Sequence, residues 1–405
     1  MTVSSDPHFP KSQRFQLRRW LRQNLFNTVG NSLLTIFCLV AIAVLSWGAI
    51  YWFNEVAQWQ VIQTNLPLFF VGQFPVEQIW RLWLFAAILA GLIGLTTAGL
   101  LQVQRLPRWS WIVAGLAGAV VLTLPVPWSA RICLVGVEAI AVAACALGLQ
   151  GGPRWLPWLG WGWVLVFPLG LWLISGGLGL APITANEWKG LLLTLLTAAL
   201  SIALSFPLGV LLALGRQSKL PAIRWVCTLY IEVVRGLPLI AILFLALNMM
   251  PLFLPPGPVR DIALNSAFAT ILFAIAGLTL FSAAYLAENV RGGLQTVPRE
   301  QVEAAKALGL NPLLVTGLVV LPQALRASIP AIVGQFISLF KDTALLSLFG
   351  FLELTGISRD ILAQSAFIGR YQEVYLFIGA IYWGICYSMS LASRRLEHQL
   401  GVGQR

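Results

Sequence analysis

Ten apolar stretches of about twenty residues follow one another along this chain, separated by short segments that hold most of its charge. A helix of about twenty apolar residues is long enough to cross the hydrocarbon core of a bilayer. Charged residues make up 10% of the sequence, whereas soluble domains contain about 25%. The sequence therefore predicts an all-α, polytopic membrane protein with about ten transmembrane helices. The predicted spans are 32–53, 79–101, 109–126, 131–149, 156–176, 188–214, 225–250, 263–287, 313–340 and 373–393.

The positions of Lys and Arg predict which side of the membrane each loop faces. With the N-terminus inside, eighteen of these residues fall on the cytoplasmic side and seven on the outer side. The positive-inside rule therefore places both termini in the cytoplasm, together with the segment 288–312. The same rule accounts for the net charge of +11. Nucleic-acid binding is not expected, because no basic face with interleaved aromatic residues stands apart from the spans.

Residues suited to catalysis or metal binding are scarce. The two histidines, His8 and His398, lie near opposite ends of the chain, and no two of the five cysteines form a CxxC pair. Histidine-based catalysis and metal clusters are therefore not expected. The sequence G-x-x-x-x-G-K-[ST] is missing, so the chain should not bind ATP through a P-loop. We expect no enzyme activity, no cofactor and no metal on this chain.

Tryptophan usage divides the chain into two parts. Fifteen of the 17 tryptophans precede residue 190, and many lie at span ends, as is typical of residues at a membrane interface. This asymmetry indicates two differently constrained halves. We predict an N-terminal accessory transmembrane region with a basic cytoplasmic leader over 1–185, a transmembrane transport core of five spans over 186–396, and a cytoplasmic tail over 397–405.

A polar stretch over 297–312 interrupts the apolar sequence and is predicted to form a short, exposed helix. Pro298 suits the first helical position, and Gly309 can adopt the left-handed conformation that ends a helix. Small residues, including Ala304 and Ala305, should give this helix one smooth surface for close approach. A small-residue helix held at the membrane surface is suited to docking a soluble partner.

The residues Glu303-Ala304-Ala305, followed by Gly309 and then Val319-Val320-Leu321-Pro322, resemble the EAA loop of ABC importer permeases. Further segments resemble permeases for polar amino acids, in particular the histidine/glutamine/general L-amino-acid branch, and the resemblance covers roughly 186–396. These segments are Glu232-Val-Val-Arg-Gly-Leu-Pro238, Tyr285-Leu-Ala-Glu-Asn-Val-Arg-Gly-Gly293, Leu321-Pro-Gln-Ala-Leu-Arg326 and Phe340-Lys-Asp-Thr-Ala344.

This resemblance implies a permease subunit of an ATP-driven importer for polar L-amino acids, with a five-helix core of the ABC type I importer class. It implies a bacterial-type inner (plasma) membrane as the location. A dimer of ATP-binding subunits, which carry ATP and Mg, would dock on the EAA loop through Glu303, Ala304, Ala305, Gly309 and Pro322. The other implied partners are a second permease, expected to be a different chain, and an external substrate-binding protein. The alternative is an ion-coupled secondary amino-acid transporter, which should show membrane-embedded carboxylates in matched repeats.

Two pairs of ionisable residues lie in or beside predicted spans, where charge is costly and is therefore a candidate for function. Glu232 and Arg235 are three residues apart, and Glu288 and Arg291 repeat this spacing. Each pair is either an intrahelical ion pair that neutralises itself or part of a charged cytoplasmic gate or anchor for the EAA loop.

A third polar group, Lys341, Asp342 and Thr343, interrupts the apolar run near the outer end of the ninth span. Lys341 and Asp342 could bind the carboxylate and the ammonium of an amino acid. They could also be a snorkelling lysine and a helix-end aspartate. Pro238, which follows Gly236 within the seventh span, is expected to interrupt the helix, with a kink that contacts no ligand as the commoner outcome.

Overall fold

The structure, a computed structural model, describes residues 17–101, 115–116, 118–119, 121–122, 126–151 and 156–401. Within these ranges the chain is helical and has no β-strand, which confirms the predicted all-α class. The chain divides into two compact units, Met1–Trp59 and Gln60–Arg405.

The described part of the first unit contains two helices. They are α1 (Leu17–Asn24) and α2 (Val29–Tyr51), and α2 continues as a π-helical turn over Trp52–Val56. The hydroxyl of Thr28 accepts a hydrogen bond from the backbone N–H of Asn31 and so caps the start of α2. α2 is long and apolar enough to cross a membrane, and it corresponds to the first predicted span.

Among the described residues, four helices of the second unit have bounds that can be given within the predicted accessory region. They are α3 (Gln60–Val71), α4 (Trp80–Leu101), α6 (Trp128–Gly151) and α7 (Leu156–Ser175). Short 3₁₀ turns precede α4 and follow α7, at Val76–Gln78 and Ala185–Glu187. Most of the predicted third span, 109–126, lies outside the described residues.

Small residues set the packing of α4 against α6. Gly94 faces the backbone of Ala141, and Gly148 faces the methyl group of Ala98, so the two helices run in the same direction. A Cβ atom at either glycine would collide with the facing helix. Small residues of this kind allow helix backbones to approach closely in a membrane. The parallel arrangement agrees with the predicted order of spans, in which one further crossing separates α4 from α6.

The predicted transport core begins after α7. Its long helices are α8 (Gly190–Arg216), α9 (Pro221–Gly236), α12 (Ala267–Thr296), α15 (Leu321–Asp342) and α17 (Tyr371–Gln399). Shorter helices connect them: α10 (Leu239–Phe244), α11 (Pro258–Asn265), α13 (Arg299–Ala307), α14 (Pro312–Leu314) and α16 (Ile357–Leu362). Two π-helical segments, Leu245–Met249 and Val315–Val320, and three 3₁₀ segments, Met250–Phe253, Thr343–Phe349 and Ser365–Phe367, complete the core.

α12 lies at the centre of the core. Gly209 of α8 packs against Leu286 of α12, and the hydroxyl of Ser328 on α15 donates a 3.0 Å hydrogen bond to the carbonyl of Asn289. α12 therefore touches α8 on one side and α15 on another. Fully buried residues of α8, α9, α12 and α15 form one hydrophobic cluster: Ala213, Ile231, Leu286, Ala287, Val290 and Ala324.

The predicted seventh span is sharply bent. α9 and the segment Leu239–Phe253 meet at an angle of 109°, with Leu237 and Pro238 between them. Pro238 has no backbone N–H to continue the helix, and proline also disfavours a helical conformation in the residue before it. The break expected at Pro238 is thus present, and it turns the span rather than only kinking it.

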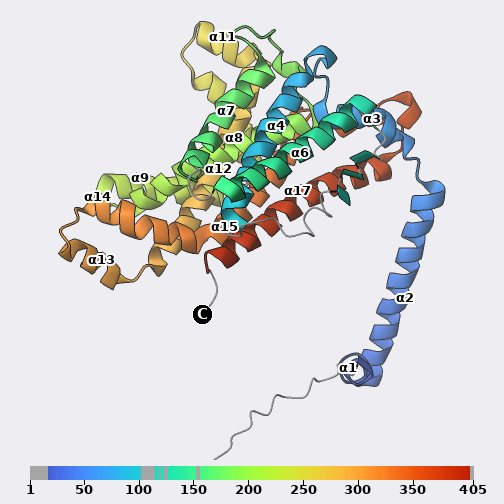
Figure 1. Cartoon of the computed structure of the whole chain (residues 1–405), viewed down its shortest axis with the longest axis horizontal. Coiled ribbons are helices and arrows are strands. Elements are labelled where there is room, and N and C mark those ends of the chain that lie inside the picture. Colours follow the sequence, from blue (N-terminus) through green and yellow to red (C-terminus); the bar gives the residue numbers. More distant parts are fainter. Residues whose placement is uncertain are drawn as a thin grey trace, which may run out of the picture. The chain divides into compact units, whose positions relative to one another are not determined.

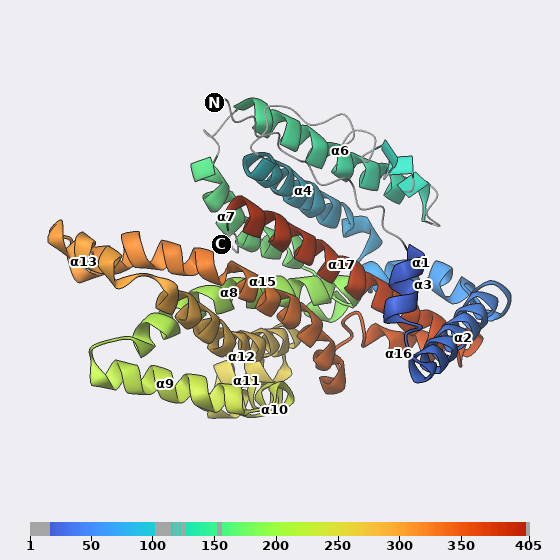
Figure 2. The same cartoon turned by 90° about the horizontal axis from the view of Figure 1, so that it is seen from below.

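Eight described helices are long and apolar enough to cross a membrane, and the bent pair makes a ninth. This agrees with the predicted polytopic architecture. Figure 2 shows α13 at one end of the second unit and α16 at the other. The side chain of Arg326 on α15 donates to the carbonyl of Leu400, so the end of α17 lies toward the end that carries α13. We call this the α13 end, and the other the opposite end (Figure 1).

Candidate functional site

The predicted surface helix is present as α13. It covers Arg299–Ala307, with Pro298 at its N-cap position. Gly309 follows in a left-handed conformation with φ of 80°, which favours glycine. The N–H groups of Gly309 and Leu310 donate to the carbonyls of Lys306 and Ala305, at 2.9 and 3.3 Å, and so close the C-terminal end of the helix.

The small residues of α13 do not share one surface, as the sequence had suggested. Ala305 is buried at 4% exposure, whereas Glu303, Ala304 and Gly309 are exposed. Ala305 is placed on the side of α13 that packs against its own chain, and α13 contacts the π-helical segment Val315–Val320. Residues close together on a helix can point to different faces, because each residue turns the direction by about 100°. The surface open to a partner is therefore narrower than predicted.

Pro322 lies just after the π-helical segment that supports α13. The N–H of Leu321 donates to the carbonyl of Thr316, five residues back, which is the π-helical spacing. Pro322 has no N–H, so the usual bond to the carbonyl four residues back cannot form there, and a wider turn accommodates its ring. At the other end, the side chain of Asn311 accepts from the N–H of Leu314 at 2.9 Å. α13 thus joins α15 through an irregular segment that is capped at its start by Asn311.

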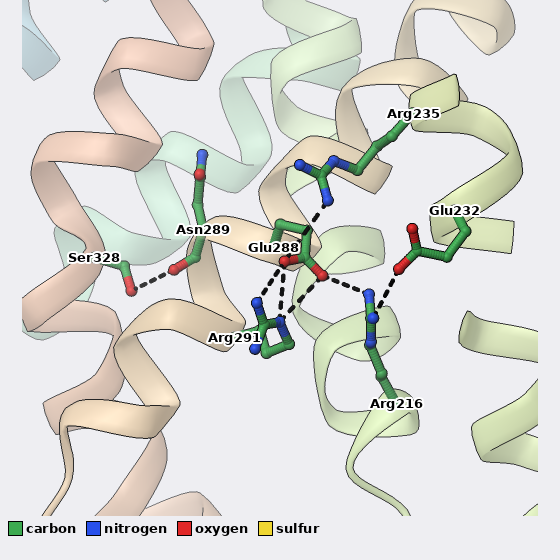
Figure 3. Close-up of polar contacts among 7 residues, drawn as sticks. All are labelled: Arg216, Glu232, Arg235, Glu288, Asn289, Arg291 and Ser328. Carbon is green, nitrogen blue, oxygen red and sulfur yellow. Dashed lines mark hydrogen bonds and ion pairs between the residues drawn. The ribbon is translucent and has the colours of Figure 1, made fainter. Parts of the chain in front are cut away.

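Five charged side chains meet near the α13 end of α12 and form one cluster (Figure 3). The Glu288 carboxylate accepts from the Nη2 and Nε of Arg291 at 2.8 and 3.0 Å and from Arg216 at 2.5 Å, and it lies 3.7 Å from Arg235. Arg216 also binds Glu232 at 2.7 Å. We call these residues the arginine–glutamate cluster. Glu288 is its centre, because it contacts all three arginines.

The cluster corrects one prediction and extends another. Glu288 and Arg291 do form an ion pair within one helix. Glu232 and Arg235, by contrast, are not paired with each other, and each reaches a residue on a different helix. The sequence did not identify Arg216 as a member. Arg216 is the last residue of a long apolar helix, where a cation is favoured by the helix dipole. This position could have marked it as a candidate in the sequence.

The cluster joins three helices at a partly dehydrated position. Arg216 ends α8, Arg235 lies in the last turn of α9, and Glu288 lies in α12. The Glu288 side chain is 15% exposed, and the arginines are 23–37% exposed. The guanidinium of Arg235 also lies over the ring of Tyr285, 5.4 Å from its centre. Three arginines against two glutamates leave one surplus positive charge.

The neighbouring residue of α12 connects the cluster to α15. The side-chain amide of Asn289 donates to the carbonyl of Ala331 at 3.2 Å, and Ser328 donates to the carbonyl of Asn289. Gly293 lies so close to Ser328 and Ala324 that a Cβ atom there would overlap both. α12 and α15, which flank α13 in sequence, are therefore held together next to Glu288.

The structure does not bring Lys341, Asp342 and Thr343 to this cluster. They lie where α15 ends, away from the α13 end. Thr343 is buried and donates to the carbonyl of Phe340 at 2.7 Å, whereas Lys341 is exposed and Asp342 is half-buried. In the part of the chain that the structure describes, no ion pair involves Lys341 or Asp342.

Sequence reasoning missed Glu353, which is fully buried beyond the end of α15. Its carboxylate accepts from the backbone N–H groups of Thr355 and Gly356, both at 2.8 Å, and from the hydroxyls of Thr194 and Tyr382 at 3.4 and 3.2 Å. Burial raises the pKa of Glu353 to about 7 despite these donors. Glu353 thus ties the segment before α16 to α8 and α17.

The described helices therefore form a multi-pass membrane bundle that presents a short polar helix at one end. Residues 205–402 match the family of binding-protein-dependent transport system inner membrane components. Over 402 residues the chain is 33% identical to an inner membrane amino-acid ABC transporter permease protein, YhdY of Escherichia coli, covering 95% of this chain and 93% of that one. The chain belongs to this family of inner membrane transport components.

Two further relatives bear on the length of the chain. It is 35% identical to a glutamate/glutamine/aspartate/asparagine transport system permease protein, BztC of Rhodobacter capsulatus, over 94% of this chain and 93% of that one. It is 36% identical to a probable glutamine ABC transporter permease protein, GlnP of Bacillus subtilis, over 52% of this chain and 91% of that one. Some relatives therefore match nearly the whole chain, whereas others match about half of it.

Proposed function

We propose that this chain is the transmembrane permease subunit of an ATP-driven importer for polar amino acids. Its family membership and the names of its long relatives support this assignment. The observation that carries it is α13, an exposed short helix at one end of the bundle, flanked in sequence by the two helices that pack beside the arginine–glutamate cluster.

We propose that α13 is the docking element for a separate ATP-hydrolysing subunit. Glu303, Ala304 and Gly309 form its open surface, while the buried Ala305 faces the rest of the chain. Pro322 lies just after the π-helical segment that α13 contacts. ATP and Mg bind on that partner, and this chain carries neither. When α13 moves, α12 and α15 move together, because hydrogen bonds of Asn289 and Ser328 connect these two helices. The helices then exchange inward-facing and outward-facing arrangements.

In this proposal the arginine–glutamate cluster keeps the α13 end of the path closed. Glu288 connects the ends of α8 and α9 to α12, so these helices move together while its ion pairs persist. Partial burial strengthens the Coulomb attraction between Glu288 and the arginines, and it also carries a desolvation cost. Separation of the pairs in another state would open the path at the α13 end. Lys341, Asp342 and Thr343 remain candidates for contact with substrate nearer the opposite end.

The remaining partners follow from the same assignment. A second permease subunit, expected to be a different chain, completes the path, and an external binding protein delivers the amino acid. The count of Lys and Arg favours an inner membrane orientation with both termini and α13 in the cytoplasm. The location of Leu400 and α13 toward the same end of the bundle is consistent with this orientation.

The test is to purify the tagged chain in mild detergent and identify its stoichiometric companions by mass spectrometry. An ATPase and a second permease in equal amounts support the proposal. Reconstituted uptake should require ATP and resist an ionophore, whereas ionophore-sensitive uptake would indicate the ion-coupled carrier instead. Ala304→Trp should abolish ATPase co-purification, because its bulk blocks the open face of α13. Ala222→Trp, on an exposed residue at the start of α9, is the matched control and should keep the ATPase.

A further inference from the structure

Arg81 is a buried arginine with very few partners. It is the second residue of α4 and lies at the end of the unit opposite to α13. Only 1% of its surface is exposed. Its Nη1 donates to the carbonyl of Ala181 at 2.8 Å, and its guanidinium lies 5.8 Å from the centre of the Trp80 ring. Its Nε atom is buried without a hydrogen-bond partner. A buried charge without a counter-ion is costly, so another group is needed to compensate it.

Glu187 is a negatively charged residue that also has an unsatisfied buried atom. Its Oε1 accepts from the hydroxyl of Thr184 at 3.1 Å, but its Oε2 is buried and has no hydrogen-bond partner. All four ion pairs of the described residues belong to the arginine–glutamate cluster, so Arg81 and Glu187 are not paired with each other. Each of the two side chains therefore keeps one buried polar atom unsatisfied, which is uncommon in folded proteins.

Both residues approach the same hydrophobic cluster. Leu82, next to Arg81, packs against a cluster that contains Ile183 and Trp188, the second of which is next to Glu187. Arg81 belongs to the accessory region, whereas Glu187 lies three residues before α8, the first helix of the transport core. A link between them would connect the accessory helices to the core.

The segment that carries Glu187 borders a cavity. A cavity of about 490 Å³ is lined by its residues Ile183 to Asn186 and Trp188, and by the start of α12. The segment follows a tight turn in which Gly176, Gly177, Leu178 and Gly179 all have positive φ. Leu178 has a φ of 47° and is 95% exposed, so it gains nothing from burial in return for this strained conformation. Ile183 and Trp188 are buried and anchor the segment, whereas Thr184 and Asn186 between them are exposed, so this short stretch is its least packed part.

We propose that Arg81 and Glu187 form an ion pair in a second conformation of the transporter, and that this pair couples the accessory helices to α8 during transport. The inference rests on the alternation of states in the proposed function. In the conformation described here the pair is open, and its two unsatisfied atoms destabilise this state relative to the closed one. The accessory region would then shift the equilibrium between the two conformations of the transporter, in addition to spanning the membrane.

A double-mutant cycle on reconstituted uptake by the complete transporter tests the pair. Arg81→Gln and Glu187→Gln should each slow uptake by about fivefold, and the double variant should be no slower than either single variant. Losses that multiply in the double variant would overturn the inference. Arg131 offers a matched control, because it also binds backbone carbonyls and lies over a tryptophan ring. Arg131→Gln combined with Glu187→Gln should give losses that multiply.

Cross-linking provides a measurement that does not depend on the folding of the Gln variants. With the five native cysteines replaced by serine, Trp80→Cys and Asn186→Cys, which are exposed neighbours of Arg81 and Glu187 and leave both charges in place, should cross-link more in the ATP-and-vanadate-trapped transporter than in the resting one. Equal yields in both states would overturn the inference. The unsubstituted protein separates the two proposals: if it shows no ATP-driven uptake, the proposed function fails, and with it this inference. If it transports normally while the cycle is multiplicative, only the inference fails.

Discussion

Replacing the central carboxylate of the cluster tests how strongly it holds three helices together. Glu288→Gln removes the negative charge that contacts Arg216, Arg235 and Arg291 but keeps the shape of the side chain. Losing one partner of a buried ion pair costs about 3–5 kcal/mol. The Glu288 side chain is 15% exposed and the arginines 23–37%, so solvent screening reduces this cost. We expect a loss of about 2–3 kcal/mol in the free energy of unfolding.

Glu232→Gln is the matched control. The side chain of Glu232 is 58% exposed and contacts only Arg216 within the cluster. Exposed ion pairs contribute at most about 1 kcal/mol. The assay is unfolding of the purified complex in detergent, followed by tryptophan fluorescence, together with uptake in proteoliposomes. High salt should only slightly reduce the difference in stability loss between Glu288→Gln and Glu232→Gln, because Glu288 is partly shielded from solvent. If Glu288→Gln loses no more stability than Glu232→Gln, the cluster does not hold the helices together.

Three further outcomes are expected. Gly309→Leu should reduce ATP-driven uptake by about tenfold while the chain still folds. Gly309 has a left-handed backbone conformation, in which a leucine would strain the end of α13. Gly309→Asn should retain more uptake, because asparagine tolerates this conformation. Gly209→Val should cost about 1–3 kcal/mol of stability, because its Cβ would press on Leu286, whereas Gly236→Val has open space and should cost less by the same unfolding assay. The free energy of unfolding should fall as pH rises from about 4.5 to about 7, since burial raises the pKa of Glu353 and folding favours its protonated form. This slope should disappear in Glu353→Gln, and a slope that persists would assign the effect to another group.

Local features were predicted well because they depend on residues close together in sequence. The bounds of α13 follow from Pro298 and Gly309, which respectively favour the start and the end of a helix. The sharp break of the seventh span follows from Pro238, whose ring prevents continuation of the helix. The membrane-spanning helices follow from hydropathy, which sums over a window of about twenty residues.

Contacts between helices could not be predicted in this way. Glu232 and Arg235 have the spacing of an intrahelical pair, yet Glu232 binds Arg216 and Arg235 lies near Glu288. Ala305 belongs to the motif but faces its own chain. Glu353 lies in a segment with no sequence signal and is nevertheless fully buried.

The sequence by itself determined that this chain spans a membrane, where its surface helix begins and ends, and which family its motifs resemble. The tertiary structure alone decided which charged groups meet, which motif residues remain exposed, and that Arg81 and Glu187 each keep one buried polar atom without a hydrogen-bond partner. The physical reason is the range of the forces involved. Hydropathy and helix capping act within one helix, whereas the partner of a buried charge depends on which faces of distant helices pack together.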